Sequence, residues 1–229
     1  MNENKTADIW KIMADRHSVR QYTDRKIEME KRTELEKLAE ACNRGSGMHI
    51  QLIYDEPGCF DSMMAHYGKF KGVSNYIAMV GRKDAPDLEE KCGYFGEKIV
   101  LKAQELGLNT CWVALTYGKR KCRAVVKKEE KLCCVIALGY GSTQGVPRPS
   151  KSVEQVSDYQ PGMPEWYKKG IEAALLAPTA MNQQKFYFTY NDGKVLLKAG
   201  KGFYTKMDLG IVKYHFRLAS GYKFGGRDA

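Results

Sequence analysis

Hydrophobic residues recur along the chain in patterns that predict several helices. In four stretches apolar side chains stand three or four positions apart, which places them on one face of a helix. The longest of these ends at Gly107, a residue type that commonly terminates helices. A short additional helix is expected near the N-terminus. The predicted helices lie at about residues 7–14, 35–42, 95–106, 167–175 and 209–219.

Other stretches show the patterns of strands. Apolar residues alternate with polar ones over residues 48–54, which is typical of a strand with one buried face. Residues 74–81, 110–116 and 132–138 are instead almost continuously apolar, and we expect buried strands there. Phe186, Phe188 and Tyr190 alternate again, and Asp192-Gly193 predicts a hairpin turn before a last strand at residues 195–197.

A weak internal repeat runs through this order of elements. Helix, small-residue loop and strand recur at an offset of 133, so that Leu38 corresponds to Ile171 and Ser46 to Thr179. A second correspondence, at an offset of 114, pairs Gly107 with Gly221. Helix–loop–strand units often look alike, so coincidence is one explanation. Two matches in the same order favour two related half-domains, the first over about residues 1–150 and the second over about 160–229.

The composition is that of an ordinary globular protein of 229 residues, with 43% hydrophobic and 28% charged residues. No run of apolar residues approaches the length of a membrane span, and the N-terminus lacks the pattern of a signal peptide. We therefore expect a cytoplasmic protein that does not bind membranes. The seven cysteines form no CxxC pair, which favours reduced, mostly buried thiols and no metal site.

The net charge of +10 favours anionic partners in general. Nucleic acid is one alternative, because residues 119–128 are rich in lysine and arginine. No recognition helix or aromatic RNA-binding motif accompanies this basic stretch, so a solvated helix face is the simpler interpretation, and we expect no nucleic acid partner.

Two polar segments are candidates for ligand binding. Arg16, Ser18 and Arg20 place two planar cations and a hydroxyl close together, which suits an anionic, oxygen-rich ligand, although a solvated basic turn would have the same sequence. Residues 177–184 combine small residues with Asn182 and two glutamines, so a flat ligand could approach the backbone closely. A helix end followed by a turn would explain this second segment equally well.

The combination resembles the FMN-dependent nitroreductase family. Its R-x-S-x-R/K motif is similar to residues 16–20, and its P-S/T-x-x-N-x-Q segment is similar to residues 178–184. Residues 93–115 and 136–156 resemble the family's central helix with its C-W strand and its basic, proline-rich arm. The chain has Lys185 and Phe186 where the family has proline and tryptophan.

The resemblance implies an α+β fold with a mainly antiparallel central sheet flanked by helices. It also implies a set of FMN contacts, in which the flavin carries the chemistry and no protein side chain is the catalytic group. Residues 16–20 and the arm would hold the phosphate, ribityl and pyrimidine side, the end of a strand would pass near flavin N5, and the second segment would border the ring. These contacts are Arg16, His17, Ser18, Arg20, Ala114, Leu115, Thr116, Arg148, Lys151, Pro178, Thr179, Ala180 and Asn182.

In most of the family the two motifs lie close in sequence, and two identical chains pair to form the flavin sites. Here the second motif follows about 160 residues later, inside the repeated unit, which resembles a smaller nitroreductase subfamily whose single chain folds as a pseudo-dimer. We therefore expect one nitroreductase-like domain over residues 1–229, a monomer that needs no partner chain, and one FMN per chain.

The function implied is that of an NAD(P)H-dependent flavin oxidoreductase. NADH or NADPH would deliver a hydride to FMN, which would pass it to a small aromatic electron acceptor such as a nitroaromatic or a quinone. The alternative is a flavin-binding protein without turnover, serving as a sensor or a store. The sequence does not choose between NADH and NADPH.

Overall fold

The computed structural model describes residues 3–225, and their contacts divide them into two compact units. We call residues 16–88 and 99–146 the sheet unit, and residues 3–15, 89–98 and 147–225 the helical unit. The units do not follow the chain order, because the N-terminal helix and residues 89–98 group with the C-terminal residues.

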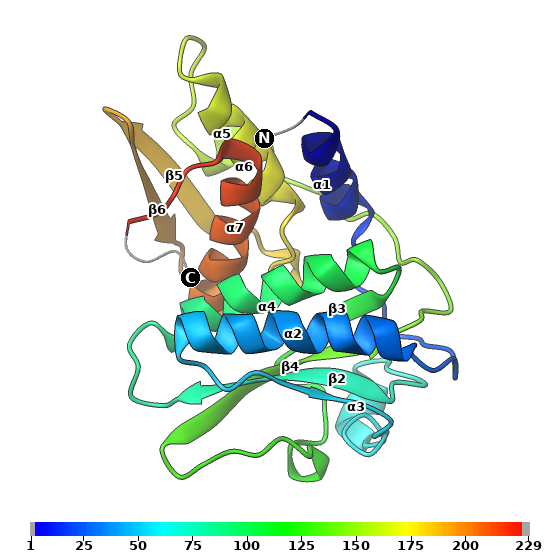
Figure 1. Cartoon of the computed structure of the whole chain (residues 1–229). Coiled ribbons are helices and arrows are strands. Elements are labelled where there is room, and N and C mark those ends of the chain that lie inside the picture. The colour runs from blue at the N-terminus through cyan, green and yellow to red at the C-terminus, as the bar shows by residue number, and fades with distance from the viewer. Residues whose placement is uncertain (1–2, 226–229) are drawn as a thin grey trace. The chain divides into compact units, whose positions relative to one another are not determined.

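The sheet unit is built on four antiparallel strands in the order β1-β2-β4-β3 (Figure 1). Their bounds are Gln51–Ile53 for β1, Asn75–Arg82 for β2, Asn109–Val113 for β3 and Glu130–Gly139 for β4. The predicted α+β class with a mainly antiparallel sheet is confirmed. All four strands lie at predicted positions, although β1 is shorter than the alternation of residues 48–54 suggests.

Both faces of this sheet are covered, which explains the continuously apolar strands. Helix α2 (Met29–Ser46) and the second part of α4 (Leu88–Glu105) lie over one face (Figure 1), joined by an ion pair between Lys102 Nζ and Glu34 Oε2 at 2.8 Å. On the other face Phe60, Phe70 and Val73 pack against Tyr76 and Val135 from the strands. The short helix α3 (Met63–Tyr67) lies in this second layer and was not predicted, because five residues show no helical period.

The helical unit contains α1 (Glu3–Asp15), α5 (Val153–Val156), α6 (Glu165–Leu176), α7 (Thr205–Ser220) and the hairpin of β5 (Phe186–Asn191) and β6 (Lys194–Ala199). Its core is aromatic, with the rings of Phe188 and Phe216 stacked at 4.8 Å between centroids. His215 is fully buried and its Nε2 lies 2.9 Å from Glu97 Oε1, so this histidine has a structural role in the helical unit.

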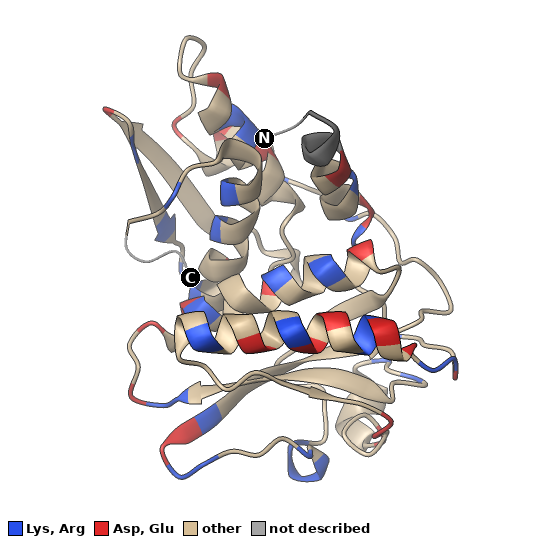
Figure 2. Ribbon diagram, viewed as in Figure 1, with Lys and Arg blue, Asp and Glu red and all other residues tan. Residues whose placement is uncertain are grey.

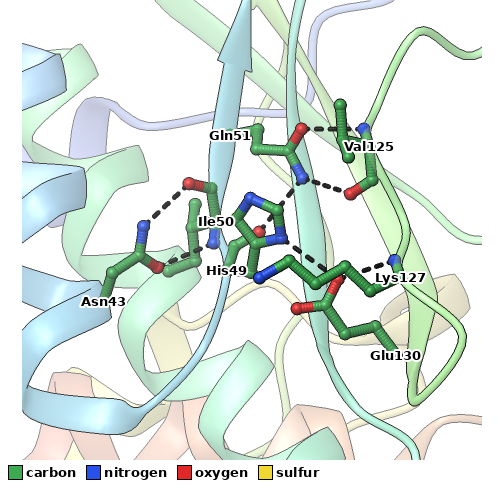
Figure 3. A network of polar contacts seen from close by, with 7 residues as sticks. All are labelled: Asn43, His49, Ile50, Gln51, Val125, Lys127 and Glu130. Carbon is green, nitrogen blue, oxygen red and sulfur yellow. Dashed lines mark hydrogen bonds and ion pairs between the residues drawn. The ribbon is translucent and has the colours of Figure 1, made fainter.

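The interpretation of the basic stretch as a helix face is wrong. Only the 3-10 turn η1 (Lys119–Lys121) is helical there, and an extended segment follows it beside β1 (Figure 2). Gln51 holds this segment in place, because its side chain accepts from Val125 N and donates to Val125 O, both at 2.8 Å (Figure 3). The backbone groups of Val125 are therefore satisfied without a helix, while the basic side chains of the stretch remain exposed.

No helix among residues 3–225 is both long enough and apolar enough to cross a membrane.

Candidate functional site

The first polar segment is fixed along the edge strand of the sheet. Ser18 forms a parallel bridge with Thr110 of β3, and Val19 N donates to Thr110 O at 3.0 Å. Three residues after Val19, Tyr22 N donates to Lys71 O at 2.9 Å. Backbone hydrogen bonds therefore hold the segment from both ends, and its side chains are presented from a defined position.

The polar side chains of this segment gather around Cys111 on β3. Burial raises the pKa of the Cys111 thiol, and the charge of Arg20, a hydrogen bond with Ser18 and the charge of Arg16 act in the opposite direction. Arg16 is only 2% exposed, whereas Ser18 and Arg20 are exposed. Of the two cations, Arg20 is the one that solvent reaches.

The segment predicted to pass near flavin N5 follows β3 directly. Leu115 is 59% exposed, and Thr116 packs so closely on Gly68 that a Cβ there would lie 2.6 Å from Thr116 Cβ. Residues 16–20 and 114–116 thus flank the same strand within the sheet unit. Seven predicted contacts lie in this unit: Arg16, His17, Ser18, Arg20, Ala114, Leu115 and Thr116.

The other predicted contacts lie in the helical unit, on the arm and on the loop after α6. This loop contains the 3-10 turn η2 (Ala180–Asn182), with left-handed backbone at Met181 (φ 50°), Asn182 (φ 54°) and Gln184 (φ 43°). Asparagine adopts this conformation more readily than most residues, whereas methionine and glutamine do so rarely. The surrounding contacts must hold the loop in this shape.

Gln184 provides much of that hold. It is 2% exposed, and its Nε2 donates to Ser150 Oγ and to Leu175 O, both at 3.1 Å. Its Oε1 accepts from Lys151 N at 2.8 Å, and its own backbone N donates to Thr179 Oγ1 at 3.0 Å. One buried amide therefore joins the arm, the end of α6 and the loop.

The two basic residues of the arm bind the same loop. Arg148 Nη2 donates to Leu176 O at 2.8 Å and to Ala177 O at 2.5 Å, so it caps the C-terminal carbonyls of α6. Lys151 Nζ donates to Gln184 O at 2.8 Å. In this structure both cations position the loop, and their predicted contact with a phosphate stays a prediction.

Asn182 has the features of a ligand contact. Its Nδ2 donates to Pro149 O at 2.8 Å. Its Oδ1 is buried and has no hydrogen-bond partner among the described residues. A buried acceptor without a donor is costly, so this oxygen fits an N–H group of a bound ligand. The isoalloxazine ring of FMN carries such a group, and the loop residues therefore fit the cofactor that the resemblance implies.

Asp208, in the first turn of α7, is a further residue of this loop that sequence reasoning missed. Its Oδ1 accepts from Ala180 N at 2.9 Å and its Oδ2 accepts from Gln183 Nε2 at 2.8 Å. Burial raises the pKa of the carboxyl to about 6, against the effect of these two hydrogen bonds. A single aspartate on an otherwise helical pattern gives no sequence signal for such a role.

Comparison with known proteins identifies the family. The family model described as "Putative TM nitroreductase" matches residues 8–220. The chain belongs to this family. The match spans both polar segments, and membership of a nitroreductase family makes the chain an oxidoreductase, as predicted. A search of curated proteins gives no match.

Solved structures of nitroreductases share the fold. A "putative nitroreductase" of Thermotoga maritima is 22% identical with a TM-score of 0.66, over 92% of this chain and 82% of that one. A "Putative NADH dehydrogenase/NAD(P)H nitroreductase" of Parabacteroides distasonis is 21% identical with a TM-score of 0.53, over 68% of this chain and 98% of that one. A "putative nitroreductase in complex with fmn" of Desulfovibrio desulfuricans is 16% identical with a TM-score of 0.51, over 67% of this chain and 96% of that one.

The sheet unit of this nitroreductase also contains a cavity of about 1100 Å³ lined by residues such as Tyr22, Phe60 and Phe70. None of the predicted flavin contacts lines it. Within residues 3–225, no group of three or more His, Cys, Asp or Glu residues is arranged to hold a metal ion.

Proposed function

We propose that this protein is an FMN-dependent oxidoreductase that passes a hydride from NADH or NADPH through FMN to a small aromatic acceptor such as a nitroaromatic or a quinone. The observation that carries the proposal is the family match over residues 8–220, which includes both polar segments. The structure of the Desulfovibrio desulfuricans relative is described as a complex with FMN, and the Parabacteroides distasonis relative is named for NADH and NAD(P)H.

The sheet unit offers the groups for the anionic parts of the cofactor. Arg20 is exposed and can make bidentate, charge-assisted hydrogen bonds to a phosphate or to the pyrimidine oxygens. When bound, FMN supplies the chemistry of two-electron and hydride transfer. A cation near the pyrimidine would stabilise the negative charge that develops there on reduction. Ser18 would add a neutral hydroxyl donor, and Arg16 would act from a buried position.

The helical unit offers the groups for the ring. The buried Oδ1 of Asn182 would accept from an N–H of the flavin, while Thr179, Ala180 and Pro178 would border it. Arg148 and Lys151 would act mainly as positioning residues, because both bind loop carbonyls. The proposal needs no protein nucleophile and no metal, and its partners are small molecules rather than nucleic acid.

A visible spectrum of the purified protein and an anaerobic titration with NADH and NADPH test the proposal. We expect flavin absorbance in the spectrum, bleaching of that absorbance by at least one nicotinamide, and its recovery when a quinone or a nitroaromatic is added. A flavin that neither nicotinamide bleaches would support the alternative of a sensor or store. Absence of flavin after reconstitution with FMN would contradict both.

A further inference from the structure

The cavity of about 1100 Å³ in the sheet unit has no role in the proposed function. Its lining comes from three segments of the chain, residues 21–26, 55–61 and 66–74, and all three belong to the sheet unit. We call them the first, second and third segments of the cavity. Ligand sites in proteins have volumes of about 300–1,000 Å³, so this cavity is large enough for a ligand with more than one ring.

Backbone hydrogen bonds fix the walls of this cavity. Tyr22 N donates to Lys71 O at 2.9 Å, which joins the first segment to the third. Glu56 N donates to Ser74 O at 2.7 Å, which joins the second segment to the third. Gly72 is required where the first and third segments meet, because its φ is 70° and a Cβ there would lie 2.3 Å from Tyr22 O. The cavity is therefore formed before a ligand binds, which lowers the cost of binding.

The buried part of the lining is apolar, and we call it the floor of the cavity. It consists of Tyr22, Phe60, Phe70 and Val73, each of which is buried. The rings of Phe60 and Phe70 pack edge to face with their centroids 5.1 Å apart. Aromatic and aliphatic side chains of this kind pack well against a flat ring, so the floor fits an aromatic part of a ligand.

The third segment gives the cavity a cationic wall. It contains Lys69 and Lys71 and no acidic residue. Both lysine side chains line the cavity and are exposed, and among residues 3–225 neither ammonium group has a hydrogen bond or an ion pair. Lys69 has a left-handed backbone (φ 62°), which is uncommon for lysine, and its N donates to His66 O at 2.9 Å. Because an ammonium group is a compact charge that binds phosphate, this wall fits a phosphate group.

The acidic residues of the cavity lie on the other two segments. Asp55 Oδ2 is paired with Arg32 Nη1 at 2.9 Å, so its charge is balanced within the protein. Asp24 and Asp61 are exposed, and their carboxylates can accept hydrogen bonds from N–H or O–H groups. Asp61 also lies near a histidine, with 3.7 Å between its Oδ1 and His66 Nε2. The cavity therefore suits a ligand that is anionic at one end and carries hydrogen-bond donors elsewhere.

We propose that this cavity binds a nucleotide-like ligand, which combines a flat aromatic ring, a phosphate group, and hydroxyl or amine donors. The ring packs on the floor, Lys69 and Lys71 bind the phosphate, and Asp24 and Asp61 accept hydrogen bonds from the donors. No predicted flavin contact lines the cavity. The proposal therefore goes beyond the proposed function and does not depend on it.

The test is calorimetric titration of the FMN-saturated protein with AMP, adenosine and inorganic phosphate. We expect AMP to bind saturably at one site per chain. Adenosine and phosphate should each bind at least about tenfold more weakly, because each lacks half of the contacts. AMP binding should also weaken as the NaCl concentration rises from about 50 to 500 mM, since salt screens the lysine charges. Flavin absorbance after ultrafiltration shows whether FMN stays bound.

Three results would overturn the proposal. The first is no AMP binding up to about 10 mM. The second is adenosine or phosphate that binds as tightly as AMP, because then the phosphate or the ring makes no contribution. The third is AMP that releases FMN, because the nucleotide then occupies the flavin site. If the protein holds no flavin, the proposed function fails, and the same titration of the flavin-free protein with the variants below decides this proposal separately.

Lysine variants locate the ligand in the cavity. Lys69→Gln and Lys71→Gln each remove one exposed charge and leave the backbone bonds of the third segment in place. Each should weaken AMP binding about three- to tenfold and leave the affinity for adenosine and the flavin content unchanged. Lys37→Gln is the matched control, because Lys37 is an exposed lysine of the same unit on α2, and it should bind AMP as wild type does. Equal AMP affinity in Lys69→Gln, Lys71→Gln and wild type would overturn the proposal.

Discussion

Arg16 and Arg20 belong to one short motif, but the structure gives them different environments. Arg16 is 2% exposed, so its replacement would disturb packing as well as ligand binding. Arg20 is exposed, and its backbone is held by a hydrogen bond in which Lys71 N donates to Arg20 O at 3.0 Å. Removing the Arg20 side chain therefore tests its charge while leaving that contact in place.

We expect Arg20→Ala to weaken FMN binding by about 1.5–3 kcal/mol, roughly tenfold to hundredfold in Kd, because charge-assisted hydrogen bonds are lost. Fluorescence titration of the apoprotein with FMN measures the change. Arg44→Ala is the matched control, since Arg44 is an exposed arginine of the same unit on α2. If Arg20→Ala binds FMN as tightly as wild type, the motif does not contact the cofactor.

The raised pKa of the Asp208 carboxyl predicts that the stability of the protein depends on pH. Its pKa is about 6 in the folded protein against an ordinary value of 3.8, so between these values the folded state binds more protons than the unfolded state. The free energy of unfolding should therefore fall as the pH rises through this window, by at most about 3 kcal/mol from this group. Denaturant unfolding from pH 4 to 7 measures the slope.

Asp208→Asn should flatten that slope, because the amide keeps an acceptor for Ala180 N and does not titrate. The exposed Asp24→Asn is the control and should leave the slope in place. An equal slope in Asp208→Asn and wild type would mean that the carboxyl stays ionised throughout.

At the scale of elements, α4 and α7 cross within the helical unit through two glycines with reciprocal contacts. A Cβ on Gly93 would lie 2.0 Å from Met207 O and 2.9 Å from Ile211 N. A Cβ on Gly210 would lie 1.9 Å from Glu90 O and 2.6 Å from Tyr94 N. Gly93 and Gly210, Glu90 and Met207, and Tyr94 and Ile211 are each 117 positions apart. Reciprocal contacts of this kind are those of two subunits around a two-fold axis, which supports the proposal of an internal pseudo-dimer.

Gly93→Ala and Gly210→Ala should each destabilise the protein, by about 1–3 kcal/mol, because a methyl group would push the two backbones apart. For a chain of this size, that corresponds to a Tm lower by roughly 2–12 °C. Because their contacts are reciprocal, the two variants should behave alike. Gly45→Ala, on the exposed face of α2, is the control and should be neutral or stabilising by up to about 1 kcal/mol. If neither Gly93→Ala nor Gly210→Ala lowers the stability of the protein, the two helices do not cross in close backbone contact.

The elements that the sequence predicted are those with a sustained period. Helices such as α2 and α4 repeat their apolar positions over several turns, and the strands β2 and β4 are apolar because both sheet faces are covered. The short helices α3 and α5 offer no period to read. Among the site residues, Gln184 and Asp208 hold the loop through hydrogen bonds to partners far away in the sequence. These roles could therefore be recognised only from the structure.

At the scale of the whole molecule, the internal repeat raises the question of a second flavin site. The loop at residues 45–49 of the first half corresponds to the Asn182 loop, but His49 in this loop and Asn43 just before it are engaged by the protein itself (Figure 3). Asn43 exchanges two hydrogen bonds with the Ile50 backbone, at 2.7 and 2.9 Å, and His49 Nδ1 lies 3.1 Å from Glu130 Oε2. Residues 158–166, which correspond to the arginine–serine segment, contain no arginine. The second site would therefore lack an arginine to bind the phosphate, and the polar groups of its loop are already bound to the protein.

We therefore predict one FMN per chain, bound by a monomer. Titration of apoprotein with FMN should saturate at one equivalent, and light scattering during gel filtration should give the mass of a single 26.0 kDa chain with and without flavin. Native mass spectrometry at low micromolar concentration gives both numbers in one measurement. A ratio of two flavins per chain would show that the second site also binds FMN. Flavin bound only by a dimer would show that two chains must pair to form the site, as in most of the family.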